Sequence, residues 1–195
     1  MKARVRLLDL RLGELFRHEA ELRVAADGVV TVCQLPAREG FSRTHFLLLE
    51  LTTVDGTLQS RNFYWLSSER DVIDSTKANW YMAKLSAFAD FHALAELPEA
   101  SLGLERQRSS ERVGDIVVGL RNTGTSLAFF TRLRLLTAAG SEVLPAHFSD
   151  NYVSLLPGEC ISVVVRDARS SESRGAEAAE VEVTGPRLKR ATLAL

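Results

Sequence analysis

Hydrophobic and polar residues alternate along much of the first third of the chain, with the period of two that is typical of half-buried β-strands. Two Asp-Gly pairs, Asp27-Gly28 and Asp55-Gly56, break the alternation, and both residue types tolerate the positive φ of a hairpin turn. Five segments carry strand-like runs: 3–8, 16–24, 29–35, 44–53 and 58–66. The pattern predicts about five strands and no helix of useful length before residue 67.

A different pattern follows over residues 67–98. Residues 67–79 are polar and irregular, and residues 88–97 (FADFHALAEL) place apolar side chains at helical spacing just before Pro98. We expect one or two turns of helix there, with Phe88, Phe91 and Leu94 packed inward.

The alternation returns after residue 99, with regular turn signals such as Asn122-Thr123-Gly124 and Pro157-Gly158. Seven or eight short strands in this length are typical of a two-sheet sandwich of immunoglobulin-like size. The runs cover 102–108, 113–121, 127–136, 142–145, 153–156, 160–166, 181–184 and 188–195. A polar loop over 167–177 is expected to be mobile.

These patterns predict an all-β chain of two tandem immunoglobulin-like β-sandwiches. Residues 1–66 form a partial sandwich, 67–98 a linker with a short helix, and 99–195 a complete sandwich. Because five strands leave one sheet thin and its edges open, we expect the first sandwich to be truncated. An open sheet edge also predicts self-association.

Composition excludes several classes of function. The chain has 195 residues and a formal net charge of −1, which argues against a nucleic-acid partner. No apolar run reaches a membrane span of roughly 18–20 residues, and the N-terminus lacks the features of a signal peptide. Cys33 and Cys160 lie in strand-like runs and are interpreted as small buried apolar residues, although a disulfide between the halves stays open.

No local pattern predicts catalysis, a cofactor or a metal. Asp71 and Asp74 lie in the polar segment, where we interpret them as capping residues of turns. The four histidines are scattered singly, no Cys/His spacing fits zinc, and no glycine-rich phosphate loop occurs. The sequence shows no local signature of a catalytic nucleophile with a neighbouring general base.

The most distinctive stretch is 61–81, which holds both tryptophans and two of the three tyrosines. We expect Trp65 and Trp80 to be buried in a seam that fixes the angle between the sandwiches, since aromatic side chains dominate packing. The alternative is that exposed rings stack on sugar. Asp150-Asn151-Tyr152 is predicted to be a turn with side-chain to backbone hydrogen bonds. The candidates for domain docking or weak sugar contact are therefore Asn62, Trp65, Trp80, Tyr81, Asp150, Asn151 and Tyr152.

Several of these segments resemble a C-terminal part of glycoside hydrolase family 2. The resemblance is strongest to the exo-β-D-glucosaminidases, with the β-mannosidases next, and thinnest over 1–60 and 167–195. The segments that carry it, in order, are 62–67 (NFYWLS), 79–81 (NWY), 88–91 (FADF), 120–123 (LRNT), 128–131 (AFFT), 143–145 (VLP) and 149–159 (SDNYVSLLPGE).

The resemblance implies a parent enzyme of about five domains, with a catalytic (β/α)₈ barrel followed by two immunoglobulin-like sandwiches. This chain would cover most of the fourth domain and all of the fifth. The catalytic glutamates lie in the barrel, so no catalytic residue carries over and this chain alone is expected to be inactive. Its partners would be the barrel and the preceding domains. The parent family is often secreted or periplasmic, but localisation stays open.

Two functions follow as expectations. The first is a non-catalytic region that packs against and supports the barrel. The second is a stand-alone carbohydrate-binding module that uses exposed aromatic rings.

Overall fold

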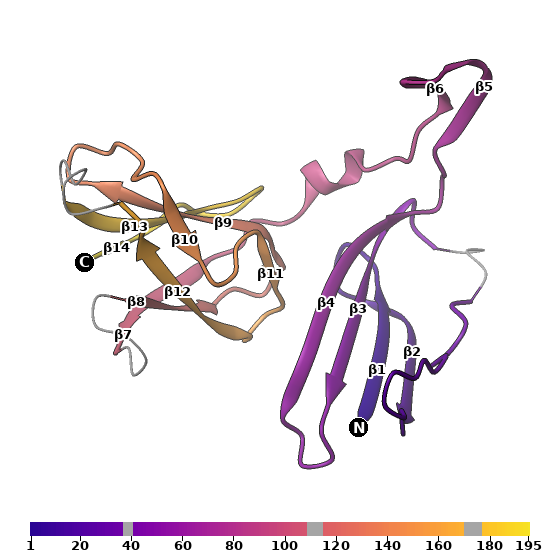
Figure 1. The fold of residues 1–195 in the computed structure, drawn as a ribbon, viewed down its shortest axis with the longest axis horizontal. Coiled ribbons are helices and arrows are strands. Elements are labelled where there is room, and N and C mark those ends of the chain that lie inside the picture. Colours follow the sequence, from indigo (N-terminus) through magenta and orange to yellow (C-terminus); the bar gives the residue numbers. More distant parts are fainter. Residues whose placement is uncertain (37–40, 109–114, 170–176) are drawn as a thin grey trace. The chain divides into compact units, whose positions relative to one another are not determined.

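The computed structural model describes residues 1–36, 41–108, 115–169 and 177–195 (Figure 1). Within them almost all regular structure is β-strand, which confirms the predicted all-β class. The chain divides into two compact units, Met1–Glu96 and Leu97–Leu195. Each unit is described by itself.

The first unit is built on a four-stranded antiparallel sheet with the order β2-β1-β3-β4 (Figure 1). Its strands are β1 (Lys2–Leu8), β2 (Glu14–Glu21), β3 (Thr44–Thr52) and β4 (Leu58–Ser67). The predicted strand over 29–35 is wrong, because these residues run outside any strand and Val29 is 96% exposed. The preference of β-branched residues for strands does not form a strand unless a neighbouring strand pairs with the segment.

The two faces of this sheet differ because successive side chains point to opposite sides. Val5, Leu7 and Leu47 share one face and form a small buried core, against which Val32 and Cys33 pack. The segment before β3 therefore covers part of this face without pairing to it. The alternate positions of β1 carry Arg4 and Arg6.

A separate two-stranded sheet follows, formed by β5 (Val72–Asn79) and β6 (Met82–Ala87) (Figure 1). The prediction of an irregular 67–79 is therefore wrong. The expected short helix is confirmed as the single 3₁₀ turn η1 (His92–Glu96). Phe91 and Leu94 are half-buried, but Phe88 precedes the turn and is 65% exposed, so its expected inward packing is wrong.

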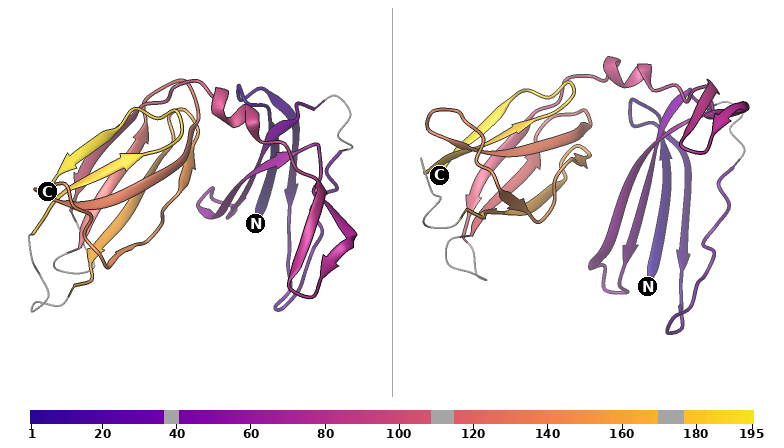
Figure 2. Two further views of the ribbon diagram at one scale, coloured as in Figure 1. Left: turned by 90° about the horizontal axis from the view of Figure 1, so that it is seen from above. Right: turned by 45° about the horizontal axis from the view of Figure 1, so that its top comes forward.

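The second unit is a sandwich of two four-stranded antiparallel sheets, as predicted (Figure 2). The first sheet has the order β10-β12-β8-β7 and the second β11-β9-β13-β14. The strands are β7 (Leu102–Gln107), β8 (Ile116–Asn122), β9 (Ala128–Thr137), β10 (Ala146–Phe148), β11 (Val153–Leu155), β12 (Cys160–Asp167), β13 (Ala178–Thr184) and β14 (Ala191–Ala194).

The core of this sandwich comes from the inward positions of both sheets. Alternation along each strand places apolar side chains on one face. The buried cluster includes Val118, Leu120, Val163 and Val165 from one sheet and Leu133, Leu135, Val181 and Val183 from the other. A single contiguous core supports the complete sandwich expected for 99–195.

Both cysteines are free thiols. Cys160 begins β12 opposite Arg121 of β8 and is exposed, so its expected burial is wrong. The reason is the period of two, because the neighbouring Ile161 takes the inward position. Cys33 is half-buried outside any strand. The predicted mobile loop over 167–177 falls largely outside the described residues.

Candidate functional site

The aromatic residues of the candidate site lie at the tip of the β5–β6 hairpin. Trp80 and Tyr81 form the two-residue loop between the strands, and Asn79 holds that loop. The Asn79 side-chain oxygen accepts hydrogen bonds from the backbone N–H groups of Tyr81, at 3.2 Å, and Met82, at 2.9 Å. Asparagine is suited to such turns because its side chain can hydrogen-bond the backbone two residues on.

The two rings at this tip project into solvent. Trp80 is 90% exposed and Tyr81 is 76% exposed, and their ring centroids lie 4.7 Å apart at 56°. The expected burial of Trp80 is therefore wrong. A loop between two antiparallel strands directs its side chains beyond the sheet, so aromatic character alone does not bury them.

The hairpin also exposes apolar side chains along its length. Val72, Ile73 and Met82 are about half exposed or more. Two aspartates bond to the backbone of the hairpin. Asp71, before β5, accepts from the Ala89 N–H after β6 at 2.8 Å, and Asp74, within β5, accepts from the Thr76 N–H at 3.1 Å. The Asp71 bond spans 18 residues and the Asp74 bond lies within β5, so the expected capping of turns is not what these bonds do. The hydrogen bond from the Thr76 hydroxyl lowers the pKa of Asp74.

Trp65 and Asn62 lie on β4, away from the tip residues in sequence. Trp65 pairs with Phe46 of β3 and is 37% exposed, so its expected burial is wrong as well. Asn62 pairs with Leu49 and contributes to an apolar hollow of about 480 Å³ on the core face of the sheet, which Val5, Val32 and Leu47 also line.

Asn151 has a structural role that the sequence only partly predicts. Its side-chain oxygen accepts from the Leu133 N–H at 2.8 Å, and its amide nitrogen donates to the Leu133 carbonyl at 3.1 Å. The Asn151 side chain thus satisfies both backbone groups of Leu133 in β9, as a residue on a paired strand would. The predicted turn is confirmed, since the Asn151 N–H bonds Asp150 and the Tyr152 N–H bonds Asn151.

Tyr152 is the remaining candidate of this turn. It has a φ of 56° and is 48% exposed, and its ring packs on Phe130 with centroids 5.0 Å apart. The candidates from the sequence therefore fall into three sets: the hairpin tip, β4 and the 150–152 turn. The first two sets belong to the first unit and the third to the second unit.

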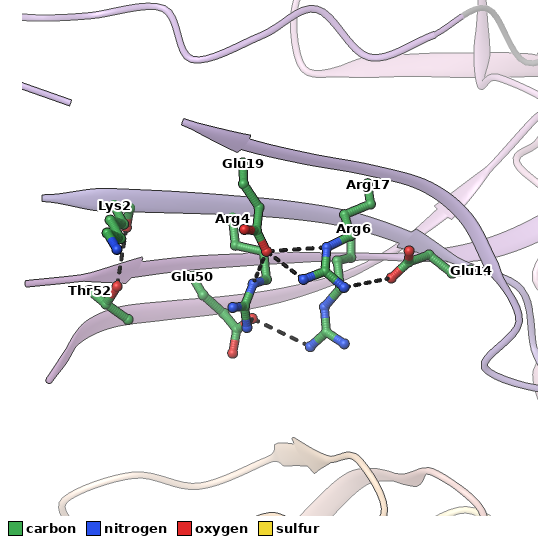
Figure 3. Close-up of polar contacts among 8 residues, drawn as sticks. All are labelled: Lys2, Arg4, Arg6, Glu14, Arg17, Glu19, Glu50 and Thr52. Carbon is green, nitrogen blue, oxygen red and sulfur yellow. Dashed lines mark hydrogen bonds and ion pairs between the residues drawn. The ribbon is translucent and has the colours of Figure 1, made fainter. Parts of the chain in front are cut away.

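A charged network covers one face of the first sheet (Figure 3). Glu19 of β2 accepts from Arg4 at 2.8 Å and from Arg17 at 2.6 Å, and Glu50 of β3 accepts from Arg6 at 3.3 Å. Arg6 and Arg17 lie opposite each other in the register, and like charges in that position repel. The two glutamates offset this repulsion, and the Arg17 hydrogen bond lowers the pKa of Glu19.

Asp90 anchors the start of the 3₁₀ turn to the sheet. Its backbone N–H donates to Ser67 Oγ at 3.0 Å, and its carbonyl accepts from Thr44 Oγ1 at 2.9 Å. Its carboxylate accepts from the His92 N–H at 3.0 Å, which is the main cause of its lowered pKa. Residues 88–96 are thereby tied to the ends of β3 and β4.

Among the residues that the structure describes, no group of three or more His, Cys, Asp or Glu side chains is placed to hold a metal ion. No helix in the same part of the chain is long and apolar enough to cross a membrane.

Sequence comparison relates the chain to enzymes that are much larger. It is 34% identical over 170 residues to the exo-beta-D-glucosaminidase of Streptomyces avermitilis, covering 84% of this chain and 19% of that protein. It is also 34% identical over 161 residues to the exo-beta-D-glucosaminidase of Amycolatopsis orientalis, covering 80% of this chain and 16% of that protein. The chain therefore spans less than a fifth of the length of these relatives.

Structural comparison agrees. The crystal structure of the exo-chitosanase CsxA of Amycolatopsis orientalis superposes with a TM-score of 0.81 at 27% identity, covering 100% of this chain and 23% of that one. Residues 80–186 match the family described as the exo-beta-D-glucosaminidase Ig-fold domain. The chain thus belongs to the family of exo-beta-D-glucosaminidase Ig-fold domains.

Proposed function

We propose that this chain is a non-catalytic region of an exo-acting glycoside hydrolase of the exo-β-D-glucosaminidase type. It packs against and supports a catalytic barrel carried elsewhere in the parent enzyme. The broader assignment to glycoside hydrolase family 2, with β-mannosidases as the next relatives, belongs to the same proposal.

The observation that carries the proposal is the β5–β6 hairpin. A two-stranded hairpin is marginally stable in water unless it packs on another element. This one exposes Trp80, Tyr81 and Ile73, of which Ile73 is 61% exposed. Rigid aromatic side chains on a hydrogen-bonded turn are typical anchors of a protein interface. Most of the length of the relatives lies outside the region that matches. The remainder of such an enzyme is the partner that we propose for the hairpin.

Docking can be tested by complementation. The Streptomyces avermitilis exo-beta-D-glucosaminidase without its matching region is titrated with this chain by calorimetry. We expect a saturable complex, and we expect Trp80→Ala to weaken it about thirty-fold, the effect of losing roughly 2 kcal/mol at an anchor residue. Val29→Ala, at another exposed apolar residue of the same unit, is the matched control.

Hydrolysis by the chain alone tests the non-catalytic part of the proposal. We expect no turnover of aryl β-glucosaminides or β-mannosides by the purified chain. Measurable turnover that persists through repeated purification would contradict the non-catalytic part of the proposal. Docking that Trp80→Ala leaves unchanged would contradict the role of the hairpin in docking.

The exposure of the hairpin tip also favours a second function, a carbohydrate-binding module. The exposed, mutually tilted rings of Trp80 and Tyr81 offer apolar faces to a sugar ring. If this function holds, glucosamine or mannose oligomers change the tryptophan fluorescence saturably, and Trp80→Ala abolishes the change without affecting stability. The docking function predicts no such signal.

A further inference from the structure

A hollow of about 450 Å³ with a mixed polar and apolar lining lies on the outer face of the sheet β10-β12-β8-β7. The strands that line it are β7, β8 and β12, whose register brings their outward positions side by side. Small-molecule sites commonly have volumes of roughly 300–1,000 Å³, so the hollow has the size of a binding site. The lining residues used below are Gly103, Glu105, Gln107, Gly119, Arg121 and Ser162.

Two of these residues are glycines inside strands. Gly103 and Gly119 are not among the glycines with positive φ, and the ladders of β7 and β12 with β8 pass them without a register shift. Neither a turn nor a bulge therefore explains them. The remaining common reason for a glycine in a strand interior is the close approach of another group or a ligand.

At Gly119 the missing side chain leaves room for a hydrogen-bonded row of polar side chains, Glu105, Gln107 and Ser162. A Cβ there would lie 2.5 Å from Gln107 Nε2 and 2.8 Å from Glu105 Cγ. Gln107 Nε2 donates to Glu105 Oε1 at 2.7 Å, and Ser162 Oγ donates to Gln107 Oε1 at 2.7 Å. Because a carboxylate only accepts, these partners also fix which end of the Gln107 amide faces Glu105. The row holds the Glu105 carboxylate over the floor of the hollow.

The lining combines strong acceptors with strong donors. Glu105 supplies a carboxylate from β7, and Arg121 supplies a guanidinium from β8. A carboxylate can accept from two neighbouring hydroxyl groups, and a guanidinium presents five N–H donors in a planar fork. Such a pair recognises a ligand that carries several adjacent hydroxyl groups.

Other kinds of ligand fit less well. β8 is paired on both sides, by β12 and β7, so an added strand cannot bond to the backbone under the hollow. One arginine beside one glutamate gives no excess of positive charge for a polyanion. Protein interfaces are enriched in aromatic anchors, and the lining contains no aromatic side chain among the residues that the structure describes.

We propose that this hollow binds a saccharide, through hydrogen bonds from its hydroxyl groups to Glu105 and Arg121. Gly119 leaves room for the Glu105 and Gln107 side chains that line the hollow. The site lies in the second unit and is separate from the aromatic hairpin tip of the first. It goes beyond the docking function and does not depend on it.

Cys160 provides the probe, because this exposed thiol lines the same hollow. Cys33→Ser leaves Cys160 as the single thiol of the chain. The rate of Cys160 alkylation by iodoacetamide is measured with and without β-1,4-linked tetramers of glucosamine or of glucose. We expect at least one tetramer to slow alkylation several-fold and saturably, and Glu105→Gln to weaken that protection about tenfold.

Two variants make the result specific. Glu99→Gln removes an exposed carboxylate elsewhere in the same unit and should leave the protection intact. Trp80→Ala should also leave it intact, which separates this site from the hairpin tip. Circular dichroism of each variant confirms that the sandwich is folded.

The proposal is overturned if neither tetramer slows alkylation up to millimolar concentrations. It is also overturned if a tetramer protects Cys160 in the Glu105→Gln variant as well as it does in the parent chain. It is also overturned if the truncated Streptomyces avermitilis enzyme, without sugar, protects Cys160, because the hollow would then be a protein interface. Loss of docking in the calorimetric experiment with sugar protection retained would contradict only the docking function.

Discussion

Asn122 shows how one buried polar side chain joins three segments of the second unit. Its amide nitrogen donates to the carbonyl oxygens of Ser126 and Leu155, both at 2.8 Å, and its oxygen accepts from the Gly124 N–H at 3.0 Å. The residue is only 1% exposed. Because a buried polar group costs free energy unless it is hydrogen-bonded, these three bonds have to form together.

We expect Asn122→Ala to lower the free energy of unfolding by about 2–4 kcal/mol. Each lost hydrogen bond contributes roughly 1 kcal/mol, and the buried Leu155 carbonyl loses a donor. Urea denaturation followed by circular dichroism measures the change. Thr123→Ala, at the exposed neighbouring residue, should change stability by less than about 1 kcal/mol. Equal effects of the two substitutions would contradict this account of Asn122.

Glu19 gives the first unit a dependence on pH. Its folded pKa lies below the unfolded value because Arg17 and Arg4 hydrogen-bond the ionised form. The contribution to stability is therefore present above the unfolded pKa of about 4.3 and is lost as pH falls through the folded pKa. We expect Glu19→Gln to lower the melting temperature at pH 7 and to have little effect near pH 3. Thermal melts at both values test this, and an equal loss at pH 3 would exclude the ion pairs as its cause.

At the scale of the element, alternation predicted the strands whose apolar side chains reach a core. It failed for 29–35, where a β-branched run lies beside the sheet without pairing to it. It also failed for β5 (VIDSTKAN), which has no alternation to detect. That strand pairs with β6, and the Asp71–Ala89 bond closes the base of the hairpin across 18 residues. No local pattern in the sequence reports such contacts.

The candidate site was predicted in part for the same reason. Aromatic content marks 61–81 as distinctive, but it does not tell which of its tryptophans are exposed. Burial depends on position in the hairpin, and the available signal was Asn79, a turn residue directly before Trp80 and Tyr81. The sequence does not predict the hollow of the second unit, although Gly103 and Gly119 interrupt the expected strands 102–108 and 113–121.

β4 is the element from which we expect self-association. It has ten residues and lies at one edge of the first sheet, and Arg61 is the only charged residue in it. A long edge strand with few charges is a template for pairing with another chain. We expect the chain to form dimers in sedimentation experiments at micromolar concentration. Asn62→Lys should shift it toward the monomer, whereas Gln34→Lys, outside the sheet, should not; a monomeric parent chain would contradict the prediction.

The whole molecule consists of two units whose cores differ in extent. The first unit has a single four-stranded sheet, with Val5, Leu7 and Leu47 buried on one face and Phe46 and Leu48 buried on the other. The second encloses its core between two sheets. A sheet face needs a second layer to bury it, so the two units are expected to depend to different degrees on the rest of a larger enzyme. Most of the family match, residues 80–186, falls on the second unit.

We therefore expect residues 97–195 to fold alone, with one cooperative unfolding transition. Leu135 is fully buried between the sheets, so Leu135→Ala in this fragment should lower the free energy of unfolding by about 2–5 kcal/mol through lost burial and the cavity left behind. The same substitution in the full chain should have the same effect, whereas Leu7→Ala, in the core of the first unit, should leave the transition of the second unit unchanged. Denaturation curves of the fragment and the full chain make this comparison. A fragment that unfolds without cooperativity would show that the sandwich requires the first unit, and the enclosed core would then be insufficient for independent folding.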